Sequence, residues 1–234
     1  MGSCCSKHPN DGTGIEADKD QSEMYLKKSQ NMTANVDFSS KGMMAVSAMP
    51  DITDETMKEV KKKLGEFRWD KLPKYDDPDI EQVGPVEYVN NGAIYRGQMK
   101  SGLRHGAGTQ VWKDGSRYEG EWRNDKANGY GRLMHADGDV YEGLWRNDTA
   151  CGKGKYYHVQ GAIYQGDWLD DAQHGEGRED WPDGTYYEGS YIQGKKEGRG
   201  KFYWVDGSYY FGDFKDNNIN GKGIHRLIRQ ILLE

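Results

Sequence analysis

The sequence has too few apolar residues and cysteines for several common kinds of protein. Hydrophobic residues are 35% of the chain, whereas globular domains usually reach about 45–50%, so no thick aliphatic core is expected. No apolar run approaches the ~18 residues of a membrane-spanning helix, and no signal-peptide core is present, so we expect the cytosolic side. Three cysteines, two of them adjacent, make no disulfide framework. The net charge of −6 argues against general nucleic-acid binding.

Aromatic residues and glycine, by contrast, are abundant and recur at a fixed interval. The chain has 16 Tyr, 7 Trp and 32 Gly, and the tripeptide Tyr-x-Gly returns every 23 residues. Its six tyrosines are Tyr95, Tyr118, Tyr141, Tyr164, Tyr187 and Tyr210. A Gly-x-Gly pair, such as Gly129 and Gly131, follows each copy in the same phase. A fixed period of ~20–50 residues indicates stacked repeats, which directs the search for function toward surfaces.

Each repeat reads as one β-hairpin. Side chains alternate across a strand, so Tyr118, Gly120 and Trp122 share one face and the two intervening glutamates share the other. Asp125 stands where other repeats have Gly or Asn, residues that tolerate the positive φ of a tight turn. The Gly-x-Gly pair opens the second strand, and Gly138 closes the unit. Strands about 4.8 Å apart, two to a repeat, give an array roughly 55–60 Å long.

This combination of Tyr-Glu-Gly-x-Trp and Gly-x-Gly at a 23-residue period resembles the MORN repeat family. The resemblance covers about 92–223, and a further half-repeat is expected at 84–91. It implies an all-β repeat array, an elongated and twisted antiparallel sheet of MORN hairpins. It implies no single activity, because MORN arrays occur beside lipid-kinase and methyltransferase domains, in membrane-junction proteins, and in ciliary and cortical scaffolds.

The rest of the chain falls into three parts. Residues 1–50 are rich in polar residues and read as a disordered tether. Residues 51–91 form a connector with a short helix at about 54–64. Residues 224–234 carry apolar residues at helical spacing and predict a helix that caps the last hairpin.

The connector helix has its own start and stop signals. Thr53 or Asp51 can cap its N-terminus, and Gly65 suits its end. Its apolar stripe is narrow and needs a surface to lie on, and the aromatic face of the sheet is the candidate. The stripe is formed by Met57, Val60 and Leu64.

The N-terminus fits a lipidation signal. Gly2 and Ser6 match the N-myristoylation pattern, and Cys4 and Cys5 are candidates for palmitoylation. One myristoyl chain holds a membrane only marginally, so a second signal is needed. Residues 1–50 have five Lys against six acids, which is no polybasic patch. The second signal is therefore expected on the cysteines; the alternative is an unmodified terminus.

The row of rings is the candidate partner-binding face. A sheet that is open on one side exposes an apolar patch, and such patches usually mark binding sites. Two modes of binding fit this face: a partner helix could dock on the rings, or two copies could associate along the sheet edges. The competing interpretation is that the rings and the connector cover this face themselves. The residues are Tyr95, Tyr118, Trp122, Tyr141, Trp145, Tyr164, Trp168, Tyr187, Tyr191, Tyr210 and Phe214.

Other patterns that suggest chemistry have simpler explanations. Gly-x-Gly recurs inside hairpins and opens no helix, so no nucleotide site is expected. His105, Cys151 and His174 share one repeat position, but Asn and Glu fill it elsewhere, so no metal or nucleophilic site is expected. The lysines of 58–63 are diluted by glutamates and read as a solvated helix face. No enzyme, no cofactor and no metal are expected.

The sequence therefore favours a non-catalytic scaffold on the cytosolic face of a membrane, at the plasma or ciliary membrane or the cell cortex. Its repeats would bind a protein partner, plausibly cytoskeletal, cortical or ciliary. One alternative is a soluble structural subunit of an axoneme or another cytoskeletal assembly. Another is a phosphoinositide-binding module, which the 20 Lys and Arg against 21 Asp and Glu in 92–234 disfavour.

Overall fold

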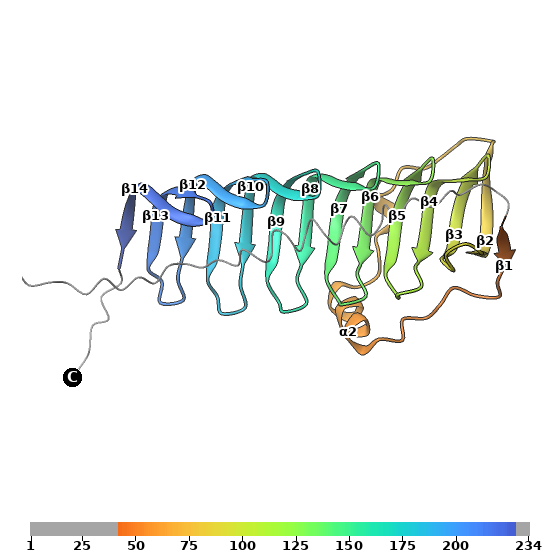
Figure 1. The fold of residues 1–234 in the computed structure, drawn as a ribbon, viewed down its shortest axis with the longest axis horizontal. Helices are drawn as coiled ribbons and strands as arrows, with labels where there is room; N and C mark the ends of the chain where they lie inside the picture. Colours follow the sequence, from red (N-terminus) through yellow and green to blue (C-terminus); the bar gives the residue numbers. More distant parts are fainter. Residues whose placement is uncertain (1–41, 228–234) are drawn as a thin grey trace, which may run out of the picture.

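The protein folds into one long sheet of consecutive hairpins. The computed structural model describes residues 42–227, and their fourteen strands pair in chain order as one sheet (Figure 1). The strands are β1 (Met43–Ala45), β2 (Ile80–Tyr88), β3 (Ile94–Lys100), β4 (Leu103–Val111), β5 (Arg117–Arg123), β6 (Lys126–Met134), β7 (Val140–Arg146), β8 (Thr149–Tyr157), β9 (Ile163–Leu169), β10 (Ala172–Asp180), β11 (Tyr186–Ile192), β12 (Lys195–Tyr203), β13 (Tyr209–Lys215) and β14 (Asn218–Arg226).

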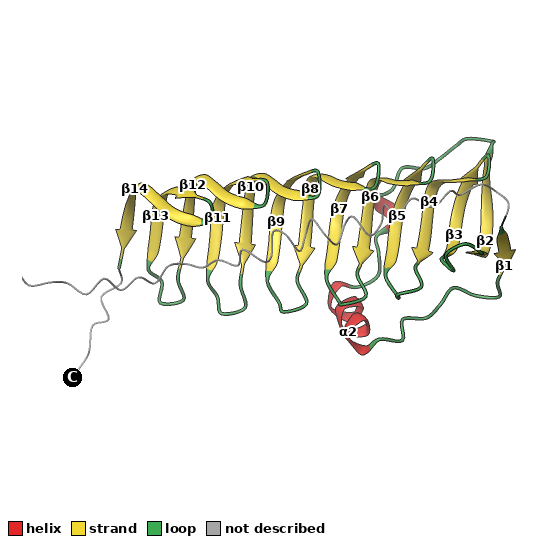
Figure 2. Cartoon of the chain, viewed as in Figure 1, coloured by secondary structure: helices red, strands yellow, loops and turns green. Residues whose placement is uncertain are grey.

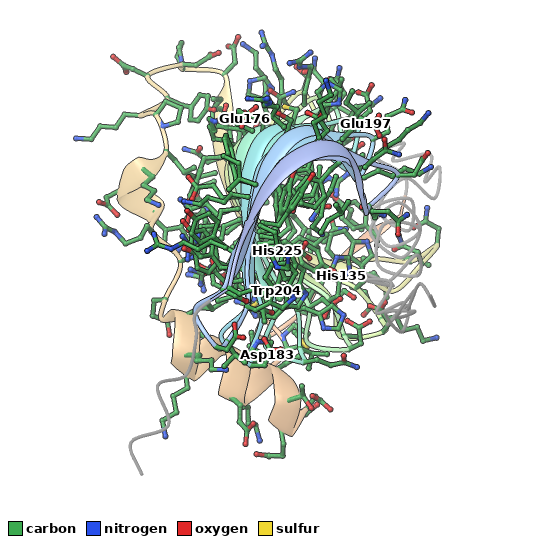
Figure 3. The ribbon with its side chains drawn as sticks, turned by 90° about the vertical axis from the view of Figure 1, so that its left-hand side faces the viewer. His135, Glu176, Asp183, Glu197, Trp204 and His225 are labelled. Atoms are coloured by element: carbon green, nitrogen blue, oxygen red, sulfur yellow. The ribbon has the colours of Figure 1, made fainter. Side chains whose placement is uncertain are left out.

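Within residues 42–227, helix is confined to the connector. An α-helix, α2 (Glu55–Leu64), and a 3-10 turn (Trp69–Lys71) lie between β1 and β2 (Figure 2). All described strand pairs are antiparallel. Figure 3 looks along the array and shows the strands as a curved band, with Glu176 and Glu197 near its upper edge and Asp183 near its lower edge. Neither of these helical segments is long and apolar enough to cross a membrane. The predicted all-β array is confirmed.

The hairpin turns follow the predicted chemistry. Asn124 and Asp125 have φ values of 49° and 67°, the mirror-image turn that matches the twist of a hairpin. The Asp125 carboxylate also accepts a hydrogen bond from the Arg104 backbone N–H of the preceding repeat (2.8 Å). Asp148 and Ala127 repeat this bond at 2.6 Å. Asp125 and Asp148 therefore adopt the positive φ that the turn requires, and each also links two repeats through a hydrogen bond.

Glycine is required where a tyrosine ring crosses the sheet. In β5 and β6, Gly120 pairs with Gly131, and the register then shifts before Trp122. The Tyr118 side chain lies over both glycines, and its hydroxyl donates to the Glu121 carbonyl (3.0 Å). The same bond from Tyr to the carbonyl three residues on recurs in every repeat. The period of 23 residues therefore reproduces one packing unit.

The larger of the two hydrophobic clusters in the described residues is a row of these rings. Tyr118 meets Trp122 of its own strand at 4.9 Å between ring centroids and Trp145 of the next repeat at 5.5 Å, both edge to face. Such contacts add to the burial of aromatic area. We call this side of the sheet the aromatic face, and the side that carries Arg117, Glu119 and their equivalents the charged face.

The connector helix lies on the charged face, not on the aromatic face as the sequence suggested. Met57 is buried against Met134 and Val140, whose neighbours in β6 and β7 place them opposite the rings. The rings already cover the aromatic face, whereas these two side chains leave an apolar patch that α2 can bury. The helix begins at Glu55 with Asp54 as its cap, because the Asp54 carboxylate accepts from the Met57 N–H at 3.0 Å; Thr53 and Asp51 do not serve.

The two ends of the array also differ in part from expectation. The predicted half-repeat at 84–91 lies in and after β2, which begins earlier, at Ile80. At the other end, β14 runs to Arg226, so a capping helix that starts at 224 is wrong for 224–226. Its remaining part, 228–234, lies outside the described residues.

Adding one methyl group at a paired glycine should test this packing. A Cβ at Gly143 would stand 2.5 Å from the Gly154 Cα and 2.6 Å from the Tyr141 hydroxyl. We expect Gly143→Ala to lower the free energy of unfolding by about 3 kcal/mol, as overpacking does where backbone must move. Chemical denaturation measures it. Gly84→Ala is the matched control, because nothing lies within 4 Å of its Cβ, and an equal loss in both variants would contradict this account.

Candidate functional site

The structure brings the predicted partner-binding residues together, but as core. All eleven, Tyr95 through Phe214, have side chains that are 6% exposed or less. The tyrosine hydroxyls and the indoles of Trp122 and Trp145 form hydrogen bonds within the protein; the Trp122 indole, for example, donates to the Gly108 carbonyl at 3.1 Å. The expectation of an exposed row of rings is therefore wrong, because neighbouring rings cover one another. A binding role for this face stays a prediction, as do the lipidation sites Gly2, Cys4 and Cys5, which lie outside the described residues.

A buried ion pair interrupts the aromatic core near the C-terminal repeats. The Lys196 ammonium lies 2.7 Å from the Glu179 carboxylate, and both side chains are only 6% exposed. Three rings lie around the ammonium nitrogen at 4.9, 5.3 and 5.5 Å, those of Trp181, Tyr187 and Tyr191. The Tyr191 hydroxyl donates to the same carboxylate at 3.2 Å. This is an aromatic cage that the protein fills with its own lysine.

The sequence contained a signal for this pair that we did not use. Lys196 occupies the repeat position of Ala127 and Ala150, and Arg104 occupies it in the first repeat. Arg104 is likewise buried, at 4.0 Å from the Trp122 ring centroid. A cation at a buried position that holds Ala in two other repeats predicts an internal partner. Both sites are closed to solvent and stabilise the fold.

A second buried polar cluster resembles acid–base machinery but is also structural. The Tyr156 hydroxyl donates to the Asp139 carboxylate (2.6 Å), which also accepts from the Val159 N–H (2.8 Å). His158 lies 3.9 Å away. Asp139 is fully buried, so no substrate reaches it. Burial raises the pKa of the Cys151 thiol, which makes it a poor nucleophile, and the described residues contain no metal-ligating group of three or more His, Cys, Asp or Glu.

The charged face is where the protein docks a segment of itself. Arg132, 4% exposed in its side chain, donates to the Gly65 carbonyl at the end of α2 (2.7 Å) and pairs with Glu142 (2.7 Å). Phe67 stacks on Tyr130 at 5.8 Å between centroids. Burial alone would raise the pKa of Glu142, but hydrogen bonds from Tyr130 and Arg132 outweigh it and lower that pKa. A cation, a tyrosine and a carboxylate together hold the connector.

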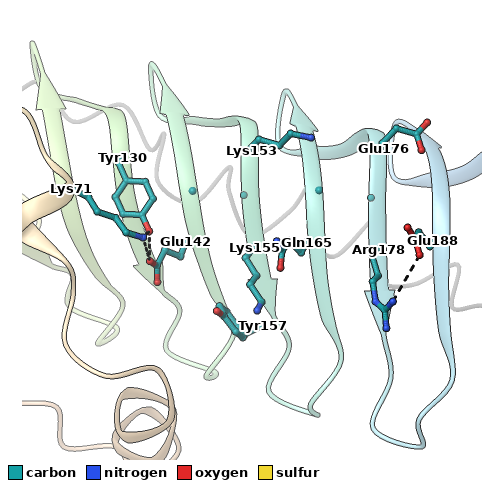
Figure 4. Close-up of a pocket in the computed structure, with 14 residues that line it drawn as sticks. Lys71, Tyr130, Glu142, Lys153, Lys155, Tyr157, Gln165, Glu176, Arg178 and Glu188 are labelled. Carbon is teal, nitrogen blue, oxygen red and sulfur yellow. Dashed lines mark hydrogen bonds and ion pairs between the residues drawn. The ribbon is translucent and has the colours of Figure 1, made fainter.

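The same face continues beyond the connector as an open groove of about 630 Å³ (Figure 4). Lys71 of the connector lines one end of the groove. Lys155 and Arg178, from the next two repeats, line it further along. These two side chains occupy the repeat position of Arg132. Lys155 lies 5.0 Å from the Tyr157 ring centroid, so the combination of cation and ring recurs. Sequence reasoning missed this groove because it weighed only the aromatic face.

The MORN repeat model matches residues 95–117, 118–140, 141–163, 164–186, 187–209 and 210–226. The protein belongs to the MORN-repeat family. The resemblance inferred from Tyr-x-Gly is thus confirmed, and the matched units start at each tyrosine and run to 226, not 223. The MORN repeat is a non-enzymatic repeat module, and no catalytic family is indicated. No curated protein matches this chain.

Solved structures give only distant likenesses to this MORN array. The TCP domain of Drosophila melanogaster SAS-4 in complex with a proline-rich motif of Ana2 is 18% identical, with 47% of this chain and 61% of that chain covered, at a TM-score of 0.34. The G-box domain of the microcephaly protein CPAP is 10% identical over 62% and 74%, at 0.41. The Danio rerio CPAP TCP10 domain with a STIL peptide is 14% identical over 60% and 70%, at 0.24. All three TM-scores lie below 0.5, so they say nothing about what this chain binds.

Proposed function

We propose that this MORN protein is a non-catalytic scaffold that holds a protein partner close to a membrane. The proposal rests on one observation: the two faces of the sheet have different roles. The aromatic face closes the core, while the charged face already holds a peptide segment through Arg132 and Tyr130 and continues as an open groove. A stiff sheet with one free face suits binding better than catalysis.

The membrane part of the proposal rests on residues outside the described structure. Gly2 would carry a myristoyl group and Cys4 and Cys5 palmitoyl groups. Two acyl signals give stable attachment where one gives marginal attachment. The location would be the cytosolic face of the plasma or ciliary membrane or the cell cortex, and the partner cytoskeletal, cortical or ciliary.

Fractionation of cells that express the full chain tests this attachment. We expect Gly2→Ala to move the protein from the membrane fraction to the supernatant, and Cys4→Ser with Cys5→Ser to do so in large part, since a single myristoyl chain binds with an association constant of only about 10⁴ M⁻¹. Ser3→Ala is the control and should stay with the membrane.

Two outcomes would contradict the attachment. Gly2→Ala protein that stays in the pellet would exclude lipid anchoring. A pellet that resists detergent but dissolves in high salt or urea would favour the structural-subunit alternative. Partner binding is tested separately, by cross-linking the full chain in cells and mapping whether partner cross-links fall on lysines of the charged face or elsewhere.

A further inference from the structure

We propose that two copies of this chain join through the outer edge of β14, so that their two sheets continue into one another about a two-fold axis. This inference goes beyond the proposed function and does not depend on it. It follows from three features of the structure: the open edge of β14, the closed edge at the other end of the array, and a register of glycines and rings that β14 forms when it pairs with itself.

The outer edge of β14 is open. The sheet ends with this strand, and no other strand of residues 42–227 pairs with its outer side (Figure 1). All of its residues are exposed, so its outer N–H and C=O groups can pair with a further strand. Exposed Ile224 (63%) lies in β14 and pairs with Phe211 (39%) of β13. They occupy the positions of Arg132 and Glu119, so the charged face becomes apolar at this end.

The other end of the array is closed. There β1 pairs with residues 86–88 of β2, and the Val46 N–H donates to the Pro85 carbonyl at 3.0 Å. Pro85 has no N–H to offer a further strand. A head-to-tail contact between β14 and β2 would therefore have to displace β1, whereas a contact between two β14 strands displaces nothing in the described residues. Such a contact of like with like is closed by its two-fold symmetry and stops at two copies.

The junctions inside the array show what a strand added to it must supply. Wherever one repeat meets the next, a glycine pairs with a glycine, and the glycine two residues earlier pairs with a ring. Gly131 pairs with Gly143, for example, and Gly129 pairs with Trp145. The other four junctions between the six repeats keep both pairs. Glycine allows this close approach because it has no side chain.

The strand β14 meets the same requirement when it pairs with a second β14. Gly223 and Gly221 are the equivalents of Gly131 and Gly129. Antiparallel pairing centred on Gly223 places this glycine opposite its own counterpart and places His225 of one copy opposite Gly221 of the other. The His225 ring is on the aromatic face, because His225 pairs with Tyr210, and Figure 3 shows it beside Trp204, at 5.2 Å between ring centroids. Each copy thus supplies the ring that the other copy's glycine requires.

The charged face suits the same register. Lys222 lies opposite Ile224 of the second copy, and Asn220 lies opposite Arg226, so no like charges are directly opposed. The two Ile224 side chains are diagonal neighbours, and with Phe211 of each copy they form an apolar patch across the junction. Like charges meet only on diagonals, where Lys222 of one copy approaches Lys222 and Arg226 of the other. We therefore expect added salt to tighten the dimer, because it screens this repulsion.

Sedimentation velocity of the full, non-acylated chain in reducing buffer measures the association. The junction of residues 220–226 is small, so we expect a monomer–dimer equilibrium with a Kd of about 10 µM and no larger species. Ile224→Lys should raise this Kd about tenfold or more, because it sets two cations directly opposite each other. Ile192→Lys is the matched control: Ile192 is also an exposed strand residue (52%), but it lies in β11, away from the junction. It should leave the Kd within about twofold.

Disulfide formation between chains tests the register. With the three native cysteines replaced by Ser, Lys222→Cys chains are mixed with Ile224→Cys chains under mild oxidation. These positions are directly opposed in the proposed register and come within disulfide reach, so we expect the mixture to cross-link unlike chains. A mixture of Lys222→Cys with Ile192→Cys chains should not cross-link unlike chains. Equal yields from the two mixtures would contradict the register.

The remaining outcomes overturn the inference. A monomer at up to about 200 µM protein would mean that no such contact forms, and a dimer that Ile224→Lys leaves unchanged would place the contact elsewhere. Species that keep growing with concentration would indicate head-to-tail association. A chain that dimerises only after removal of residues 228–234 would show that its own terminus covers β14. None of these results alters the fractionation of Gly2→Ala protein, so the proposed scaffold function stands or fails separately.

Discussion

Lys196→Ala should lower the free energy of unfolding by about 3–5 kcal/mol, because it leaves the Glu179 carboxylate charged and unpaired in a closed core. Both side chains are 6% exposed, and the ammonium lies 2.7 Å from the carboxylate. The variant also removes a cation from three rings. The loss is much larger than an exposed ion pair would give, since water cannot replace the missing partner. Denaturant unfolding followed by tryptophan fluorescence measures it.

The chain supplies its own control for this prediction. Two repeats earlier, Ala150 and Leu133 fill the equivalent positions and are both buried. Lys196→Ala combined with Glu179→Leu recreates that pair and should recover most of the loss, to within about 1–2 kcal/mol of the wild type. The residual cost is the Tyr191 hydroxyl, which loses its acceptor. A double variant no more stable than Lys196→Ala would mean that the lysine acts by packing alone.

The hairpins were predictable because each is a local sequence rule repeated. Tyr118 needs Gly120 beside it and Gly131 across from it, and the turn needs residues such as Asp125 that accept positive φ. Six copies in one phase remove the ambiguity that a single hairpin would have. The helix at 54–64 was predictable for the same reason, since its start and stop signals lie within the segment itself.

The rest could not be predicted because it depends on how neighbouring repeats meet. Alternation places Tyr118 and Trp122 on one face, but whether rings stand exposed or cover one another depends on contacts such as that with Trp145. Met134 and Val140 determine the face on which α2 docks. They are apolar residues on a face that is otherwise charged, and the 23-residue pattern does not reveal them. The same holds for the candidate site. The sequence predicted an exposed row of rings, which the structure buries. The role of the column of Arg132 and Lys155 became visible only from the contact between Arg132 and the connector.

The array should unfold abruptly above about pH 10, because its core holds neutral phenols. Burial raises the pKa of six core tyrosines above the value of about 10 expected in the unfolded chain. They are Tyr95, Tyr118, Tyr141, Tyr164, Tyr187 and Tyr191. The folded state keeps these protons when the unfolded chain would release them. Their contribution is thus fully present below pH ~10 and is lost as pH rises. Near pH 11 the loss is about 8 kcal/mol, similar to the whole stability of a domain.

Absorbance of tyrosinate near 295 nm and circular dichroism, followed in one alkaline titration, measure this effect. Tyr203 is only half-buried, and the hydrogen bond with Lys201 lowers its pKa, so it should ionise first and without loss of structure. The buried group should ionise together with unfolding. Ionisation of all 16 tyrosines in one gradual phase with the sheet intact would contradict it.

Tyr141→Phe separates the phenols from the lysines, which also titrate in this range. The variant should lose about 1 kcal/mol at neutral pH with the hydrogen bond to the Leu144 carbonyl. Above pH 10 its stability should then fall less steeply, by one proton in the slope of free energy against pH. An unchanged slope would assign the alkaline transition to lysine. A reduced one would show that the rings that build this core also set the pH limit of the array.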